Sequence, residues 1–125
     1  EEFFMQPMIH VFLCDDEGER FFGEGPYRLL KQVEECGSLR QAAIHMGMAY
    51  TKALKLVRRA EGQLGFPLIE CRTGGPRGGG SIVTAQGEEL MKQYESYRNA
   101  CREANRRIFA ECFSPERKAS SDSDR

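Results

Sequence analysis

The sequence has little of the chemistry that metal sites and active sites require. It contains only two histidines, His10 and His45, and neither lies near a pair of cysteines with the spacing of metal ligands. Its five cysteines form no CxxC motif, and the GxSxG and HExxH signatures of hydrolases and metalloproteases are missing. The sequence therefore excludes the common enzymes defined by such motifs. We expect no catalytic residues, no metal and no cofactor.

Long apolar runs are also missing. No stretch approaches the 18 or so apolar residues that a membrane-spanning helix needs, and no secretory signal pattern begins the chain. The cysteines are odd in number and scattered, at Cys14, Cys36, Cys71, Cys101 and Cys112. Because such cysteines are typical of a reducing compartment, we expect a cytoplasmic protein with free thiols and no membrane partner.

The net charge of −1 conceals an uneven distribution. Residues 1–37 carry nine acidic and three basic side chains, whereas residues 38–83 carry seven basic and two acidic ones. Residues 84–125 are balanced, with eight of each sign. A local positive field, rather than the total charge, attracts a polyanion to a protein surface. The sequence therefore predicts that double-stranded DNA binds through residues 38–83.

Periodicity and turn residues predict a mainly α-helical fold with one small β-hairpin. The 125 residues are enough for a single modest core. Ser38 has the position of an N-cap, and Gly47 that of a turn between two short amphipathic helices. We expect a strand at 7–14, an acidic turn at 15–20 without calcium-loop spacing, helices at 25–36, 39–46 and 49–64, strands at 68–71 and 81–84, and a final helix capped by Thr84. This order is typical of a winged helix-turn-helix.

The third expected helix has the composition of a DNA-recognition helix. Its exposed positions are uniformly basic before Glu61, whereas a solvated helix normally mixes charges of both signs. Residues at the leading end of a recognition helix contact bases, and phosphate contacts position it. We therefore assign DNA contacts to Ala49, Tyr50, Thr51 and Lys52 at the leading end, to Lys55 and Arg59 further along, and to Ser38 and Arg40 at the start of the preceding helix. The alternative is that these basic residues form only a solvated face.

The segment RTGGPRGGG between the last two strands is a second candidate site. Gly74 and Gly79 have phosphate-loop spacing, but Gly80 occupies the position of the required lysine and the loop joins two strands. We therefore interpret it as a DNA-binding wing, whose glycines allow close backbone approach and whose Arg72 and Arg77 lie along the minor groove. The alternative is a plain hairpin tip, which predicts that neither arginine matters.

The last helix carries a heptad pattern. Apolar and small residues recur at alternating steps of four and three, at Leu90, Tyr94, Tyr97, Cys101, Ala104 and Ile108. A helix of about 28 residues is roughly 42 Å long, longer than so small a domain is wide. Because this pattern is typical of a coiled coil, we expect the seam to contact a second copy in a homodimer. We expect a winged-helix domain with an N-terminal strand over residues 1–83, a dimerisation helix over 84–113 and a disordered tail over 114–125.

These residues resemble a known family. Residues 37–90 (GSLRQAAIHMGMAYTKALKLVRRAEGQLGFPLIECRTGGPRGGGSIVTAQGEEL) are similar to the N-terminal winged-helix domain of ModE, the molybdate-responsive transcriptional regulators, a domain itself similar to the LysR type. The most specific pieces are TGG-x-x-GGG, the following T-x-x-G at Thr84 to Gly87, and the aromatic-lysine start at Tyr50 to Lys52. The resemblance covers nearly all of residues 8–113.

The resemblance implies a bacterial regulator that binds a pseudo-palindromic operator as a homodimer. It implies DNA contacts from Ser38, Arg40, Tyr50, Thr51 and Lys52 and from the wing residues Arg72, Thr73 and Arg77. The chain departs from the family at Cys71, where members usually have an arginine, and at Pro76, which shifts the register of the basic residue after it. Nothing in the chain resembles the C-terminal molybdate-binding domains of ModE. We therefore expect a stand-alone winged helix of the ModE type or a fragment of one, with no small-molecule effector site.

A function of another class is the alternative. A winged helix can serve as a protein-interaction or assembly module, which here would use the long helix and the first strand. That alternative predicts that Lys52, Lys55 and Arg77 are dispensable, whereas phosphate contacts at these residues would make binding depend on salt.

Overall fold

The computed structural model describes residues 5–72 and 80–113. They form two compact units, which we call the core unit (Phe12–Tyr94) and the terminal unit (residues 5–11 and 95–113). The described elements are β1 (Leu13–Cys14), β2 (Arg20–Phe22), α1 (Glu24–Cys36), α2 (Leu39–His45), α3 (Tyr50–Leu64), β3 (Ile69–Arg72), β4 (Gly80–Val83) and α4 (Ala85–Phe113). The expected mainly α fold with a small hairpin wing is confirmed. The wing residues Thr73 and Arg77 and the expected tail at 114–125 lie outside the described residues.

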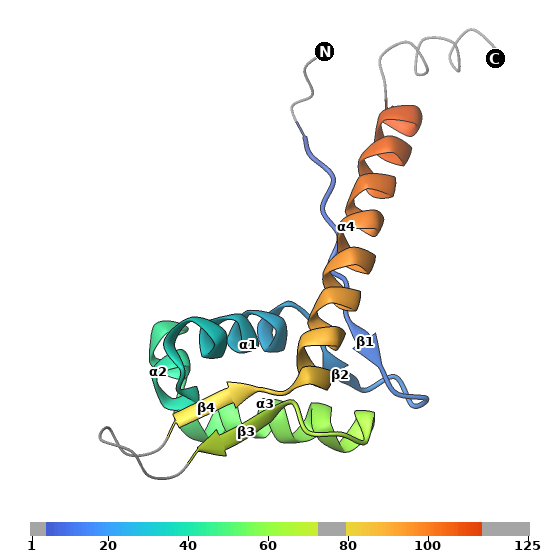
Figure 1. The fold of residues 1–125 in the computed structure, drawn as a ribbon. Coiled ribbons are helices and arrows are strands. Elements are labelled where there is room, and N and C mark those ends of the chain that lie inside the picture. The colour runs from blue at the N-terminus through green and yellow to red at the C-terminus, as the bar shows by residue number, and fades with distance from the viewer. Residues whose placement is uncertain (1–4, 73–79, 114–125) are drawn as a thin grey trace, which may run out of the picture. The chain divides into compact units, whose positions relative to one another are not determined.

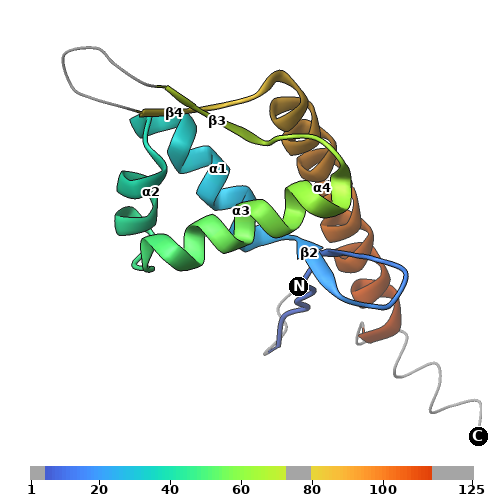
Figure 2. The ribbon, with the colours of Figure 1, turned by 90° about the horizontal axis from the view of Figure 1, so that it is seen from below.

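The core unit is a three-helix arrangement with a hairpin beside it (Figure 1). Helix α2 connects one end of α1 to one end of α3, as the second view shows (Figure 2). Strands β3 and β4 pair antiparallel, with Ile69 opposite Val83 and Arg72 opposite Gly80. Helix α1 contacts β4, α2 and α3, so it is the element around which the others assemble.

The N-terminal strand is shorter than the sequence predicts. Within residues 7–14 only Leu13–Cys14 is a strand, and it pairs antiparallel with β2, Arg20–Phe22, which the sequence does not predict. The predicted strand over 7–14 is therefore wrong for residues 7–12. A strand persists only where a neighbour completes its hydrogen bonds, and β2 is three residues long. The pattern of side chains in residues 7–14 does not reveal the length of the strand with which they pair.

Large side chains from β2, α1 and α4 form an aromatic cluster in the core. The rings of Phe22 and Tyr94 meet edge to face at 5.3 Å between centroids, and the ring of Tyr27 lies 5.3 Å from that of Tyr94. The Tyr94 hydroxyl donates a hydrogen bond to Glu24 Oε1 at 3.4 Å. The cluster fixes the first turns of α4 on the helices before it, because edge-to-face ring pairs are stabilising beyond the area that they bury.

This cluster corrects part of the dimer prediction. Tyr94 is 2% exposed and Leu90 is 7% exposed within a single chain. The assignment of these two residues to a dimer interface is therefore wrong, because their side chains already pack in the core. The core unit consequently takes in residues 85–94, which the sequence analysis placed with the dimerisation helix.

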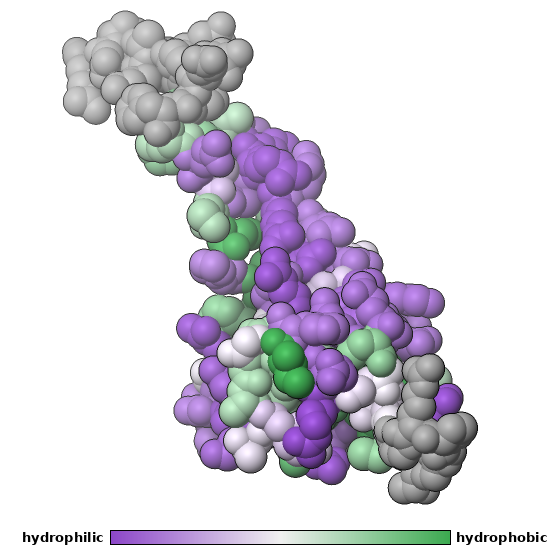
Figure 3. All heavy atoms as spheres, turned by 90° about the vertical axis from the view of Figure 1, so that its left-hand side faces the viewer, coloured by the Kyte–Doolittle hydropathy of each residue, from purple (hydrophilic) through white to green (hydrophobic). Residues whose placement is uncertain are grey.

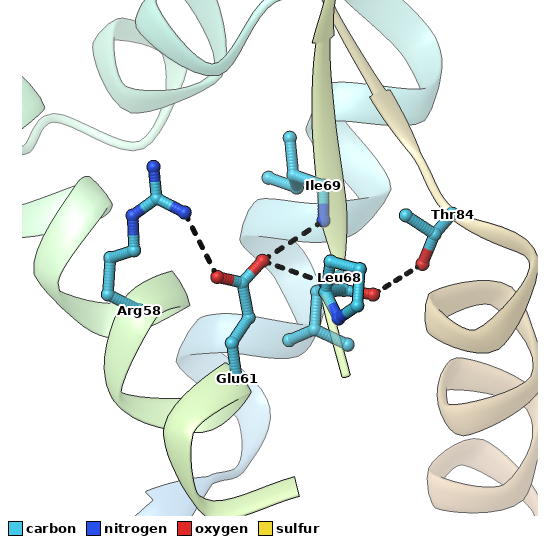
Figure 4. Close-up of polar contacts among 6 residues, drawn as sticks. Arg58, Glu61, Leu68, Ile69 and Thr84 are labelled. Atoms are coloured by element: carbon cyan, nitrogen blue, oxygen red, sulfur yellow. Dashed lines mark hydrogen bonds and ion pairs between the residues drawn. The ribbon is translucent and has the colours of Figure 1, made fainter. Parts of the chain in front are cut away.

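A half-buried carboxylate joins α3 to the hairpin (Figure 4). Glu61 Oε2 accepts hydrogen bonds from the backbone N–H groups of Leu68, at 2.8 Å, and Ile69, at 3.3 Å. Glu61 Oε1 accepts one from Arg58 Nη1 at 3.1 Å. A backbone donor without a partner is costly where water is excluded. Glu61 therefore holds the start of β3 against α3.

The start of α4 is fixed by a second polar contact and by a close backbone approach. The Thr84 hydroxyl donates to the Pro67 carbonyl at 2.6 Å, and Thr84 Oγ1 accepts from Gly87 N–H at 2.9 Å. The expected capping role of Thr84 is confirmed. A Cβ at Gly87 would lie 2.8 Å from the Leu68 carbonyl oxygen, closer than real Cβ atoms approach. Residue 87 must therefore be glycine for this packing.

The terminal unit leaves part of the heptad seam uncovered. In α4, Tyr97 is 55% exposed and Ile108 is 51% exposed, whereas Cys101 and Ala104 are half-buried. The rings of Phe109 and Phe113 lie 5.1 Å apart between centroids. Exposed large apolar side chains at seam spacing are available to a partner.

Replacement of Glu61 by alanine tests its structural role. Glu61→Ala leaves two backbone donors of β3 without their acceptor, so we expect it to lower the free energy of unfolding by about 1–3 kcal/mol. Arg58→Ala is the control, because that side chain is 65% exposed, and we expect it to change stability by no more than about 0.5 kcal/mol. Urea unfolding measures both. Equal effects from the two variants would contradict the role of Glu61.

Two glycine-to-alanine substitutions in helices should have opposite effects. Alanine usually stabilises a helix relative to glycine by about 0.5–1 kcal/mol, and we expect this gain for Gly62→Ala, because nothing lies within 4 Å of a Cβ there. Gly87→Ala should instead destabilise the protein by about 1–3 kcal/mol through overpacking against Leu68 and Val83. Thermal unfolding of both variants measures the difference, and a stabilised Gly87→Ala protein would refute the close approach.

Candidate nucleic-acid interface

Helices α2 and α3 form a helix-turn-helix. Ser38 caps α2 by accepting a hydrogen bond from Gln41 N–H at 3.1 Å, as the sequence predicts. Gly47, with φ of 67°, makes the turn, a conformation that glycine adopts at little cost. Ala53, Val57 and Ala60 are the buried residues of α3. Their small size lets α3 pack closely on the domain while its other face stays in solvent.

The exposed face of α3 carries free cations near its N-terminus. Thr51, Lys52 and Lys55 are exposed. Within the described part of the chain, neither lysine has a hydrogen bond or an ion pair. Both ammonium groups are therefore available to phosphates or base edges, as the sequence analysis expects.

Two of the predicted DNA contacts lie against each other. The guanidinium carbon of Arg40, in the first turn of α2, lies 4.1 Å from the centroid of the Tyr50 ring, at the start of α3. Such cation–π contacts hold a guanidinium in place while its edges can still donate hydrogen bonds. The structure thus places the leading ends of the two helices side by side, with Ala49 exposed as the N-cap residue of α3.

The basic residues further along α3 are engaged within the protein. Arg58 pairs with Glu61 at 3.1 Å. Arg59 Nη2 lies 2.8 Å from Glu19 Oε1, and Arg59 Nε donates to the Arg20 carbonyl at 2.9 Å. The uniformly basic face that the sequence suggests is therefore divided, with free lysines first and paired arginines after them. Sequence spacing could not show this, because Glu19 is 40 residues away from Arg59.

The base of the wing is attached near the start of α2. Ser81 N–H donates to the Gly37 carbonyl at 2.9 Å, and Ser81 Oγ accepts from Leu39 N–H at 3.3 Å. Arg72 is the last residue of β3, opposite Gly80, and is exposed. Strand β4 is therefore attached beside the start of α2, where Ser38 and Arg40 lie.

The face of the core unit on the α2 side mixes hydrophilic, intermediate and hydrophobic residues, with one strongly hydrophobic patch (Figure 3). A groove of about 470 Å³ between α1 and α2 is lined by Arg28, Lys31, Gln32, His45 and Met46. Arg28 pairs with Glu24 at 3.4 Å. None of these residues is a predicted DNA contact.

The described residues contain no group of three or more His, Cys, Asp or Glu side chains arranged to hold a metal ion. None of the helices within residues 5–72 and 80–113 combines the length and the apolar character needed to cross a bilayer.

Comparison with known proteins agrees with this geometry. Residues 26–88, from α1 to the first turn of α4, match the family described as bacterial regulatory helix-turn-helix protein, lysR family. The transcriptional regulator ModE of Haemophilus influenzae is 37% identical over 68 residues, which are 54% of this chain and 27% of that protein. The molybdenum-pterin-binding protein MopB of Rhodobacter capsulatus is 33% identical over 66 residues, 53% of this chain and 24% of that protein. The predicted resemblance to ModE regulators is confirmed.

A solved structure, the Corynebacterium glutamicum OxyR C206 mutant, matches 62% of this chain and 23% of its own with 26% identity and a TM-score of 0.48. The part of this chain that matches ModE and MopB spans about a quarter of the length of those relatives. The family match, in contrast, includes every element of the helix-turn-helix and the wing strands. The chain belongs to the bacterial regulatory helix-turn-helix proteins of the lysR family.

Proposed function

We propose that this protein is a transcriptional regulator of the bacterial cytoplasm that binds a specific, pseudo-palindromic DNA operator as a homodimer and has no enzymatic activity. The family supports regulation through a DNA-binding helix-turn-helix. The observation that carries the proposal for this chain is the pair Lys52 and Lys55 on the exposed face of α3, which have no partner within residues 5–72 and 80–113.

The proposed contacts divide into two kinds. Thr51 and Lys52, at the leading end of α3, would face base edges, because that end of a recognition helix enters the major groove. Lys55 would contact phosphate, and Arg40, held over Tyr50 at 4.1 Å, would contact phosphate beside the groove. The Ser38 hydroxyl oxygen accepts a hydrogen bond from Gln41 N–H. The hydroxyl hydrogen can therefore be donated to DNA. The wing residues Arg72, Thr73 and Arg77 complete the proposed contact set.

Substitution of the free lysines should weaken DNA binding. Each neutralised phosphate contributes about 0.9 to the slope of log K against log salt concentration. We therefore expect Lys55→Ala to reduce that slope by about 0.9 and Lys52→Ala to lower discrimination between operator and scrambled DNA by at least tenfold. Fluorescence anisotropy with a labelled duplex from upstream of the protein's own gene measures both quantities.

Lys31→Ala is the matched control for these variants. It removes one positive charge from α1, at a residue that is not among the proposed DNA contacts, and should leave the slope unchanged. Equal effects from Lys31→Ala and Lys55→Ala would show that only net charge matters. Binding that is insensitive to Lys52 and Lys55 would instead favour a protein-interaction module.

The proposal of a homodimer depends on the seam residues of α4 that do not pack in the core. Tyr97, Cys101, Ala104 and Ile108 follow the heptad spacing, and the two large side chains of this set are more than half exposed. Contact with a second copy would remove this apolar surface from water. A two-fold dimer would also present two recognition helices to the two halves of a pseudo-palindromic site.

A charged residue on the seam should weaken self-association. We expect Ile108→Glu to raise the dimer dissociation constant at least tenfold, because the interface would bury an unpaired carboxylate. Ile108→Leu keeps the apolar surface and should dimerise like the unmodified protein. Sedimentation equilibrium at several concentrations measures the dissociation constant. Undiminished dimerisation of Ile108→Glu would exclude this face of α4 as the interface.

A further inference from the structure

The strongest unexplained contact of the recognition helix is the one between Arg59 and the β1–β2 hairpin. Arg59 donates two hydrogen bonds to consecutive residues of that hairpin, from Nη2 to the Glu19 carboxylate at 2.8 Å and from Nε to the Arg20 carbonyl at 2.9 Å. The fork of the guanidinium thus recognises a side chain and a backbone oxygen together. The pair connects α3 to a segment nearly 40 residues earlier in the chain.

The hairpin turn is shaped so that Glu19 meets Arg59. Asp15 Oδ1 accepts hydrogen bonds from Glu17 N–H at 2.8 Å and Glu19 N–H at 2.9 Å. The Asp15 backbone N–H also donates to the Glu19 carbonyl at 2.9 Å. These bonds close the turn, in which Asp15, Asp16, Glu17 and Glu19 carry four negative charges. Arg59 therefore holds an ordered acidic turn beside α3.

Ion pairs with Glu61 and with Glu19 of the turn change the electrostatic character of α3 along its length. Lys52 and Lys55 are free of protein partners among the described residues, whereas Arg58 and Arg59 are paired with carboxylates. The Arg59–Glu19 pair is exposed, and such a pair alone contributes little to stability. A phosphate that approached Arg59 would, however, also approach the carboxylates of the turn. Like charges at that distance repel it.

We propose that the acidic turn at residues 15–19 limits the DNA contact to the N-terminal half of α3. Arg59 is then a positioning residue, which docks the turn on the helix, and not a phosphate contact. The turn keeps the duplex from lying flat along the whole helix and directs it to the leading end, where Tyr50, Thr51 and Lys52 lie. This inference rests on the proposed DNA-binding function and replaces the phosphate role that the sequence suggests for Arg59.

Salt dependence of binding to a short mixed-sequence duplex tests this inference, because each phosphate contact contributes about 0.9 to the slope. We expect Arg59→Ala to leave the slope unchanged. Glu19→Ala should release Arg59, raise affinity for this duplex severalfold and increase the slope by about 0.9. The double variant should return to the original slope, because the new contact requires Arg59. Lys55→Ala, with a slope reduced by about 0.9, is the positive control, and urea unfolding checks that each variant is folded.

Two outcomes would overturn the inference. A slope that falls by about 0.9 in Arg59→Ala alone would mean that Arg59 already contacts a phosphate. A Glu19→Ala protein with the original slope and affinity would mean that the turn does not limit the contact between α3 and DNA. Failure of the proposed function looks different, since neither the duplex nor the upstream DNA would then bind, with or without Lys55.

Discussion

The carboxylate of Glu61 connects the two parts of the protein that meet DNA in the proposed function. It accepts the backbone N–H groups of Leu68 and Ile69, so the chain that leaves the recognition helix must turn directly into the wing strand. From there β3 pairs with β4, and β4 donates to the Gly37 carbonyl at the start of α2. A single acidic side chain at the end of a basic helix thus determines where the wing begins relative to the helix-turn-helix. Loss of this acceptor would leave the two backbone donors at the start of β3 without their partner, which costs stability.

Ion pairs show which basic residues of the candidate interface are available to DNA, whereas a count of charges along the sequence does not. The segment 38–83 is basic overall, yet within α3 the arginines are bound to carboxylates, whereas the lysines have no partner among the residues that the structure describes. This division matters for binding because a phosphate gains most from a cation that has no other partner. Among the acidic residues of the turn, which look unfavourable for DNA binding in the sequence, Glu19 has a structural partner in Arg59. In the proposed function, this contact holds the acidic turn beside the DNA-binding helix.

Local signals predicted the elements well, and long-range pairing was the main source of error. Helix bounds, the caps at Ser38 and Thr84 and the strands of the wing followed from turn residues and apolar periodicity. The first strand was predicted too long, because the sequence does not show that β2 has only three residues. Leu90 and Tyr94 were assigned to a partner chain, since a heptad pattern cannot distinguish a residue buried by its own domain from one buried by another copy. The Phe22 and Tyr27 rings account for the burial of Tyr94.

The sequence by itself determined the order of elements, the position of the helix-turn-helix and the resemblance to ModE, because these depend on neighbours within a few residues and on a specific glycine-rich motif. It also identified Lys52, Lys55, Arg40 and Tyr50 as surface candidates. Only the tertiary structure decided which cations are free, since the partners of Arg59 lie 39 and 40 residues away and the stacking of Arg40 on Tyr50 joins two helices. Electrostatic and ring contacts act through space, and a linear pattern carries no record of which distant side chains the fold brings within hydrogen-bonding distance.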